Sequence, residues 1–181
     1  MARNDYLIDP SEYDLDRILY GIEDIRRANM QRFEMEQLTA VVYENEENGT
    51  CVGYRDLADE FWVRGHMPGM PLMPGVIMCE AAAQLCSFFA YRYQLLSDGC
   101  VGFGGLRDVK FRGVVRPGQR FVIQSKLMKY RKDRMLVAAF QCLATAGLQN
   151  PTDIVCEGEL TGVRLPQELL DSLRQGSAPT A

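Results

Sequence analysis

Near the start of the chain, apolar residues recur at intervals of three and four positions, which is the spacing of one face of an amphipathic helix. These residues are Leu15, Ile18, Leu19, Ile22 and Ile25. The spacing predicts a helix within residues 11–32, with Ser11 or Asp14 as its N-cap.

The next two apolar stretches favour strands. Residues 38–45 and 50–57 are rich in β-branched and aromatic side chains, and the turn-like Glu46-Glu47-Asn48-Gly49 separates them. Together they predict a β-hairpin.

A loop and a long helix are predicted at the centre of the chain. Residues 65–75 (GHMPGMPLMPG) contain three prolines and three glycines, which exclude regular structure. Residues 76–96 contain neither Gly nor Pro and are apolar nearly all round, so we expect one long buried helix there. The most apolar stretch, residues 76–91, carries polar side chains and is too short to span a membrane.

After residue 100 the pattern returns to strands. Four segments alternate or run apolar between breaks at charged residues, Gly and Pro: residues 101–106, 120–130, 135–146 and 154–165. Strands, one buried helix and further strands predict an α+β fold in which an antiparallel sheet wraps around the helix. The tail that follows, residues 166–181, is expected to be a short helix that frays.

Charge is distributed unevenly along the chain. The net charge of −4 and the isoelectric point near 5.1 argue against nucleic-acid binding, which needs a basic surplus. Residues 1–60 carry a net charge of −9, whereas residues 107–134 carry +8. The basic segment is either a set of solvated strand faces and turns or a docking patch for an anionic partner.

The cysteines and the N-terminal sequence bear on location. None of the six cysteines forms a C-x-x-C pair, so no zinc-site spacing exists, and we predict no metal and no cofactor. The acidic N-terminus lacks the basic flank and apolar run of a secretory signal. We therefore expect reduced thiols and a cytoplasmic location.

Three residues around the predicted loop and helix suggest a chemical site. His66, the only histidine, lies in the loop, and reactive groups tend to sit on loops held by a rigid scaffold. Glu80 lies in the apolar helix, where a buried carboxylate must be paired, protonated or functional. The N–H of Gly75, at the helix start, can polarise a carbonyl oxygen. A base, an acid and an oxyanion donor suit proton abstraction next to a carbonyl.

A polar stripe continues along the helix, because Gln84 and Ser87 follow Glu80 at i+4 and i+7. Plainer roles stay open for each candidate. His66 could be a surface histidine, Glu80 could hydrogen-bond a neighbouring loop, and Gly75 could simply start the helix.

The residues around His66 and Glu80 form a motif at fixed spacing, which comprises Gly65-His66-Met67-Pro68-Gly69, Pro71, Met73-Pro74-Gly75, Glu80-Ala81 and Gln84. This motif resembles the signature of the hot-dog-fold 3-hydroxyacyl-acyl-carrier-protein dehydratases. Phe111, Val115 and Arg116-Pro117-Gly118-Gln119 also resemble later parts of that family. The similarity covers about residues 31–165, between an N-terminal helical extension (1–30) and the C-terminal tail (166–181).

The resemblance implies a hot-dog fold and an active site shared across a homodimer, or across each dimer of a trimer of dimers. His66 of one subunit would take the α-proton of a 3-hydroxyacyl thioester carried by an acyl carrier protein. Glu80 of the other subunit would protonate the departing hydroxyl, directly or through water. The Gly75 N–H would hold the thioester oxygen, and Gln84 would orient Glu80. The product would be the trans-2-enoyl thioester of fatty acid biosynthesis.

Two segments depart from the family pattern. The usual proline-histidine-arginine segment is Met30-Gln31-Arg32-Phe33 here, and the aspartate-arginine pair that follows it is Thr39-Ala40. These segments lie where the family shapes its substrate tunnel and dimer contacts, so the acyl chain length stays open.

Two other functions compete with dehydration. A hot-dog acyl thioesterase would activate water with its carboxylate and hydrolyse acyl-carrier-protein or acyl-coenzyme A substrates. A non-catalytic acyl-binding subunit would have lost one catalytic position. Because His66 and Glu80 are both present, the sequence favours the dehydratase, a hydro-lyase.

Overall fold

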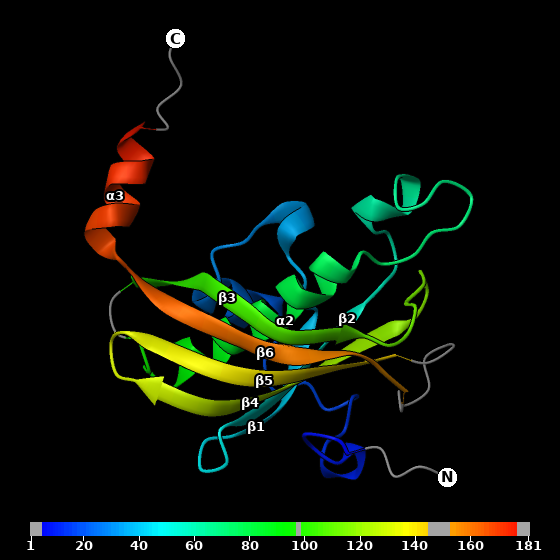
Figure 1. Cartoon of the computed structure of the whole chain (residues 1–181), viewed down its shortest axis with the longest axis horizontal. Coiled ribbons are helices and arrows are strands. Elements are labelled where there is room, and N and C mark those ends of the chain that lie inside the picture. The colour runs from blue at the N-terminus through cyan, green and yellow to red at the C-terminus, as the bar shows by residue number, and fades with distance from the viewer. Residues whose placement is uncertain (1–4, 97–98, 145–152, 177–181) are drawn as a thin grey trace.

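Six antiparallel strands wrap around one long helix (Figure 1). The computed structural model describes residues 5–96, 99–144 and 153–176. The strands are β1 (Ala40–Asn45), β2 (Thr50–Asp56), β3 (Gly99–Phe111), β4 (Arg120–Arg131), β5 (Met135–Ala144) and β6 (Asp153–Pro166). They form one sheet in the order β1-β2-β4-β5-β6-β3. The predicted α+β architecture is confirmed.

Helix α2 (Gly75–Arg92) lies against the inner face of this sheet. Its sequence is rich in Ala and has no Gly or Pro after Gly75, which favours an uninterrupted helix. Ten of its residues are buried, among them Ala82, Leu85 and Phe89. Alternate strand residues such as Phe121 and Ile123 point into the same core.

A second, smaller core lies on the outer face of the sheet. The intervening strand residues Val52, Tyr54 and Val122 point outward, and Ile8 and Leu15 from the N-terminal segment pack against them. Two buried glutamines of the sheet bind the backbone of that segment. Gln124 accepts from the N–H of Ile8 at 3.1 Å and donates to its carbonyl at 2.7 Å, while Gln141 accepts from the N–H of Leu7 at 2.8 Å.

The N-terminal helix is shorter than its apolar spacing predicts. Helix α1 spans Ile22–Ala28 only, and Gly21 precedes it, so neither Ser11 nor Asp14 is its N-cap. The backbone just before this helix pairs with a strand instead of forming a helix. Tyr20 pairs with Val41 of β1 through N–H···O bonds of 3.1 and 2.9 Å. A backbone engaged in strand pairing is not available to a helix. The extra helix therefore exists, but a helix through residues 11–32 is wrong.

Other boundaries shift more modestly. Strand β3 runs to Phe111 rather than ending at residue 106, because register shifts at Gly104 and near Asp108, whose φ is +52°, interrupt its alternation. Helix α2 ends at Arg92 instead of residue 96.

The C-terminal segment contains helix α3 (Gln167–Gly176), as predicted. The expected break between the segments 135–146 and 154–165 falls mostly outside the described residues, as does any fraying beyond residue 176. Within the described part of the chain, no helix is both long enough and apolar enough to cross a membrane. The cytoplasmic location stays a prediction.

Candidate active site

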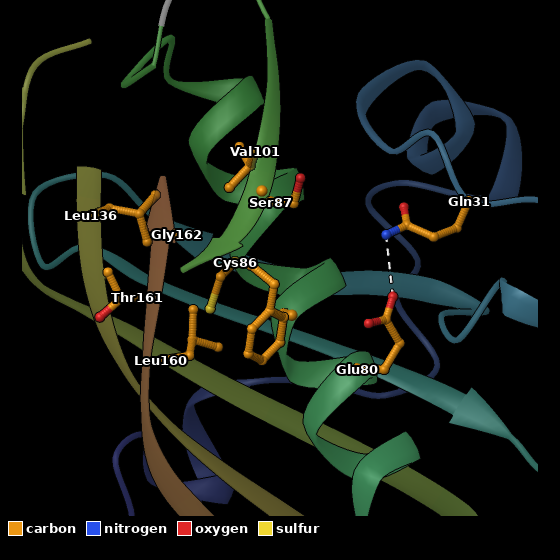
Figure 2. A pocket seen from close by; sticks show the side chains of 12 residues that line it. Gln31, Glu80, Cys86, Ser87, Val101, Leu136, Leu160, Thr161 and Gly162 are labelled. Atoms are coloured by element: carbon orange, nitrogen blue, oxygen red, sulfur yellow. Dashed lines mark hydrogen bonds between the residues drawn. The ribbon is translucent and has the colours of Figure 1, made fainter. Parts of the chain in front are cut away.

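The carboxylate of Glu80 is held by two amides. Glu80 lies in the second turn of α2 and is partly buried. Its Oε1 accepts from Nε2 of Gln84, one turn further along the helix, at 2.8 Å. The same oxygen accepts from Nε2 of Gln31 at 3.2 Å, and Figure 2 shows this side chain reaching across from the segment before β1. Glu80 is thus paired rather than an unpaired buried charge, and its bond to Gln31 is a hydrogen bond to a neighbouring loop, as the plainer reading expects.

Gln84 is buried to 2% exposure, and both ends of its amide are committed. Its Oε1 accepts from the N–H of Gln37 at 2.9 Å, while its Nε2 donates to the carbonyl of Met35 at 2.7 Å. Reversing the amide would set donor against donor and acceptor against acceptor. The group that Gln84 presents to Glu80 is therefore always an N–H.

His66 lies in an exposed loop that closes on itself. The loop follows the short 3-10 helix η3 (Phe61–Arg64), and the N–H of Leu72 donates to the carbonyl of His66 at 2.8 Å. In return, Nδ1 of His66 lies 2.9 Å from the carbonyl oxygen of Leu72. Since a carbonyl can only accept, Nδ1 carries the hydrogen, and when the ring has no second proton, Nε2 presents a lone pair that accepts from no described residue.

The start of α2 joins these two parts. Met73 donates to the carbonyl of Val115 at 2.8 Å, which ties the end of the loop to the segment after β3. Gly75 then begins the helix, and no described residue accepts from its N–H. A Cβ at Gly75 would lie 2.7 Å from the ring of Phe111, so the close approach of this side chain from β3 favours glycine here.

The structure joins some predicted residues directly and others not. Glu80 and Gln84 share a hydrogen bond, as the stripe on the helix suggests. His66 and Glu80 share no hydrogen bond, although both lie in described parts of the chain. We call the loop that carries His66 and the helix turn that carries Glu80 the two half-sites.

Comparison with known proteins decides the family. The family model of the FabA-like domain matches residues 29–153, which include all four predicted site residues. The chain belongs to the FabA-like domain family. The resemblance found in the motif is confirmed.

Relatives of this family member carry dehydratase names. One is the 3-hydroxyacyl-[acyl-carrier-protein] dehydratase FabZ of Caldicellulosiruptor saccharolyticus, with 29% identity over 78% of this chain and 96% of that protein. Another is the FabZ of Levilactobacillus brevis, with 30% identity over 64% of this chain and 72% of that protein.

Solved structures establish the fold of this FabA-like chain. The dehydratase heterocomplex ApeI:P of Xenorhabdus doucetiae matches with a TM-score of 0.64 at 14% identity, over 83% of this chain and 96% of that one. A Thermus thermophilus protein of the thioesterase superfamily matches with a TM-score of 0.55 at 16% identity, over 70% and 88%. The α+β hot-dog fold is therefore confirmed, and dehydratases and thioesterases both use it.

A cavity of about 70 Å³ lies beside Glu80, between α2 and the inner face of the sheet (Figure 2). Gln31 and Glu80 line one side of it, and Cys86, Leu136 and Leu160 line another. Burial raises the pKa of the Cys86 thiol to about 12. The thiol therefore stays protonated and lines the cavity without acting as a nucleophile.

A shallow apolar hollow also borders Glu80. We define the apolar hollow by Val76 of α2 and Phe103, Leu106 and Phe111 of β3, which line it together with Glu80. Val76 is 73% exposed and Phe111 55% exposed. Strand β3 pairs with β6 only, so its outer edge meets no strand among the described residues.

Gln31 is the site residue that sequence reasoning missed. Its segment is noticeable as a departure from the family pattern, but nothing in the local pattern connects it to Glu80. The two residues are 49 positions apart, and only the packing of the segment beside α2 joins them.

Proposed function

We propose that this protein dehydrates 3-hydroxyacyl thioesters to trans-2-enoyl thioesters in fatty acid biosynthesis. The observation that carries the proposal is that the base and acid candidates each have one atom without a hydrogen-bond partner among the described residues. These atoms are Nε2 of His66 and Oε2 of Glu80. A dehydration requires one group to accept a proton and another to give one.

The chemistry follows from the free atoms. Nε2 of His66 takes the α-proton, and the thioester oxygen gains negative charge that the Gly75 N–H stabilises. The electrons of the broken C–H bond form the new double bond. The C–O bond at the β-carbon breaks, and the hydroxyl leaves as water with a proton from Glu80. Gln84 orients the acid throughout.

Two copies would complete each site. His66 and Glu80 share no hydrogen bond within one chain, the outer edge of β3 meets no other strand of the described residues, and side chains of the apolar hollow beside Glu80 are exposed. Pairing of two β3 edges would cover that hollow and bring a second chain, with its own His66, to Glu80. We therefore propose a homodimer, or a trimer of such dimers, as the active form.

An acyl carrier protein would deliver the substrate. Three bases of the segment 107–134 are neutralised by acids of this chain, since Arg107 pairs with Glu159, Arg112 with Glu157 and Arg120 with Asp56. Docking of an acidic carrier would therefore depend on the other bases: Lys110, Arg116, Lys126, Lys129, Arg131, Lys132 and Arg134. Salt should raise the KM for a carrier-bound substrate, because it screens rim charges.

Incubation with a 3-hydroxyacyl carrier thioester, followed by mass spectrometry, tests the proposal. We expect loss of water with the acyl chain still attached to the carrier. Loss of the acyl chain would instead identify a thioesterase, and binding without any mass change would identify an acyl-binding subunit. The protein's own His66→Ala variant is the control for non-enzymatic elimination.

A further inference from the structure

The two oxygens of the Glu80 carboxylate have different surroundings. Oε1 accepts two amide N–H groups, from Gln31 and Gln84. A carboxylate oxygen offers about two lone-pair directions, so these donors fill Oε1. Oε2 has no partner among the described residues, and in Figure 2 it is turned toward the side of the cavity where Cys86 and Leu160 lie.

This asymmetry follows from the orientation of the two amides. Gln84 cannot reverse its amide, because Gln37 and Met35 fix both of its ends. Gln31 also presents its N–H to the ionised carboxylate, because an ionised carboxylate can only accept. With both N–H groups directed at Oε1, a proton placed there would oppose two donors, so in this arrangement a protonated Glu80 carries its hydrogen on Oε2.

We propose that Gln31 is a positioning residue for the catalytic acid: together with Gln84 it fixes Oε1 as the charge-holding oxygen and makes Oε2 the oxygen that delivers the proton. This inference rests on the proposed dehydration. In that step, the O–H bond of Oε2 breaks, the proton joins the departing hydroxyl to form water, and the remaining charge is held at Oε1 by the two amides.

The backbone around Gln31 is held in place by the guanidinium of Arg32. Nη1 of Arg32 donates to the carbonyls of Asn29 and Gln31 at 2.8 and 2.6 Å, and Nη2 donates to the carbonyl of Arg26 at 2.9 Å. These bonds fold the chain around the guanidinium and direct the neighbouring amide side chain toward α2. The family's usual histidine at this position is titratable, whereas the amide of Gln31 remains a neutral donor at every pH.

Few other titratable side chains line the two spaces beside Glu80. Cys86 lines the cavity, and Cys79 of α2 lines the apolar hollow together with Arg107 and Asp108 of β3. Arg107 is already paired with Glu159. The amide of Gln31 is thus the contact to the carboxylate that a substitution can remove without changing a charge.

The test is Gln31→Met, which keeps the length of the side chain but removes its donor. Gln175→Met, the same change on the exposed face of α3, is the matched control. We expect kcat for Gln31→Met to fall on the order of tenfold with KM little changed, since one hydrogen bond to a charged group is lost. The alkaline limb of the pH–rate profile should also move to higher pH, because the ionised acid has lost a stabilising donor.

The following results decide whether Gln31 positions the catalytic acid. Gln31→His, which restores a ring N–H, should recover part of kcat. Unchanged kcat and an unchanged pH profile in Gln31→Met would overturn the role of Gln31, as would a raised KM with both of these intact.

If Gln31→Met does not melt cooperatively, Gln31→Asn, whose amide is one methylene short of Glu80, replaces it with the same expected results. A parent protein that removes no water would refute the proposed function itself, whatever the variants do.

Discussion

The two half-sites of this protein differ in how far one chain satisfies them. On the helix side, Glu80 is fixed by two amides, and Gln84 is buried with both ends of its own amide bonded. On the loop side, His66 is exposed, and its described bonds join it to its own loop and to the end of η3. The acid is therefore held by long-range packing, whereas the base is held by local chain geometry.

This difference predicts how a substitution in each half-site affects stability and activity. A loop stabilised by its own turn can lose His66 without disturbing the core, because the side chain packs against little. A carboxylate held by buried amides depends on the surrounding fold, so changes there should affect stability and activity together. Substitutions in the two half-sites should therefore leave different signatures.

The largest expected effect is the loss of the base. His66→Ala should lower kcat by about 10²–10⁴-fold, since a positioned proton acceptor is removed. The melting temperature should stay close to that of the parent, because an exposed loop side chain contributes little packing energy. Activity and thermal melting are measured on the same preparation. A folded His66→Ala protein at the parent rate would remove His66 from the mechanism.

Mixing two inactive variants tests whether the half-sites meet across subunits. His66→Ala and Glu80→Ala are combined under conditions that let subunits exchange. Each mixed dimer would have one site without either group and one intact site, so activity should return to about a quarter of the parent value after random exchange. If mixed dimers form, as judged by mass, and remain inactive, both residues serve the same chain's site.

A stability effect should mark the helix side. Gln84→Leu leaves the N–H of the buried Gln37 without its partner and also removes the bond to the carbonyl of Met35. The free energy of unfolding should fall by about 1 to 3 kcal/mol, which is the cost of one buried unpaired group. Urea unfolding measures this. Gln175→Leu, on an exposed helix face, is the control, and an equal loss in both proteins would contradict the role of the buried amide.

The smallest effect is expected where the two half-sites join. In Gly75→Ala, the new methyl group would meet the ring of Phe111, which is half exposed and can move outward. We expect a loss of about 1 kcal/mol in stability, in the lower range for an overpacked contact. Gly75→Ala combined with Phe111→Leu should recover it. No recovery in the double variant would mean that Phe111 is not what requires glycine at this position.

Much of the site could be predicted because its members are close in sequence. His66, Gly75, Glu80 and Gln84 lie on one loop and the helix that follows, so motif spacing finds them. The central helix was predictable because no Gly or Pro interrupts its apolar sequence, and the hairpin because two stretches rich in β-branched and aromatic residues flank a turn-like sequence. Gln31 was not, because its contact with Glu80 arises from tertiary packing.

The N-terminal segment shows the opposite failure. Its apolar residues have helical spacing, yet they do not share one helical face in the folded chain. Leu15 is buried in the outer core, Ile25 in the inner core, and Ile18 is 55% exposed. The pairing of Tyr20 with Val41 ends any helix before it reaches Gly21. Periodicity alone cannot distinguish a single apolar face from residues that pack on two different surfaces.

The segment that binds Gln124 and Gln141 has a practical consequence for anyone who shortens this protein. Trimming the chain to the part that resembles the minimal family member would uncover the outward-facing Val52, Tyr54 and Val122, and would leave the two glutamines without their backbone partners. Bare apolar sheet surface of this kind promotes aggregation. A truncated version chosen for simplicity would therefore be harder to keep in solution, and a bulky purification tag is better attached at the other end of the chain.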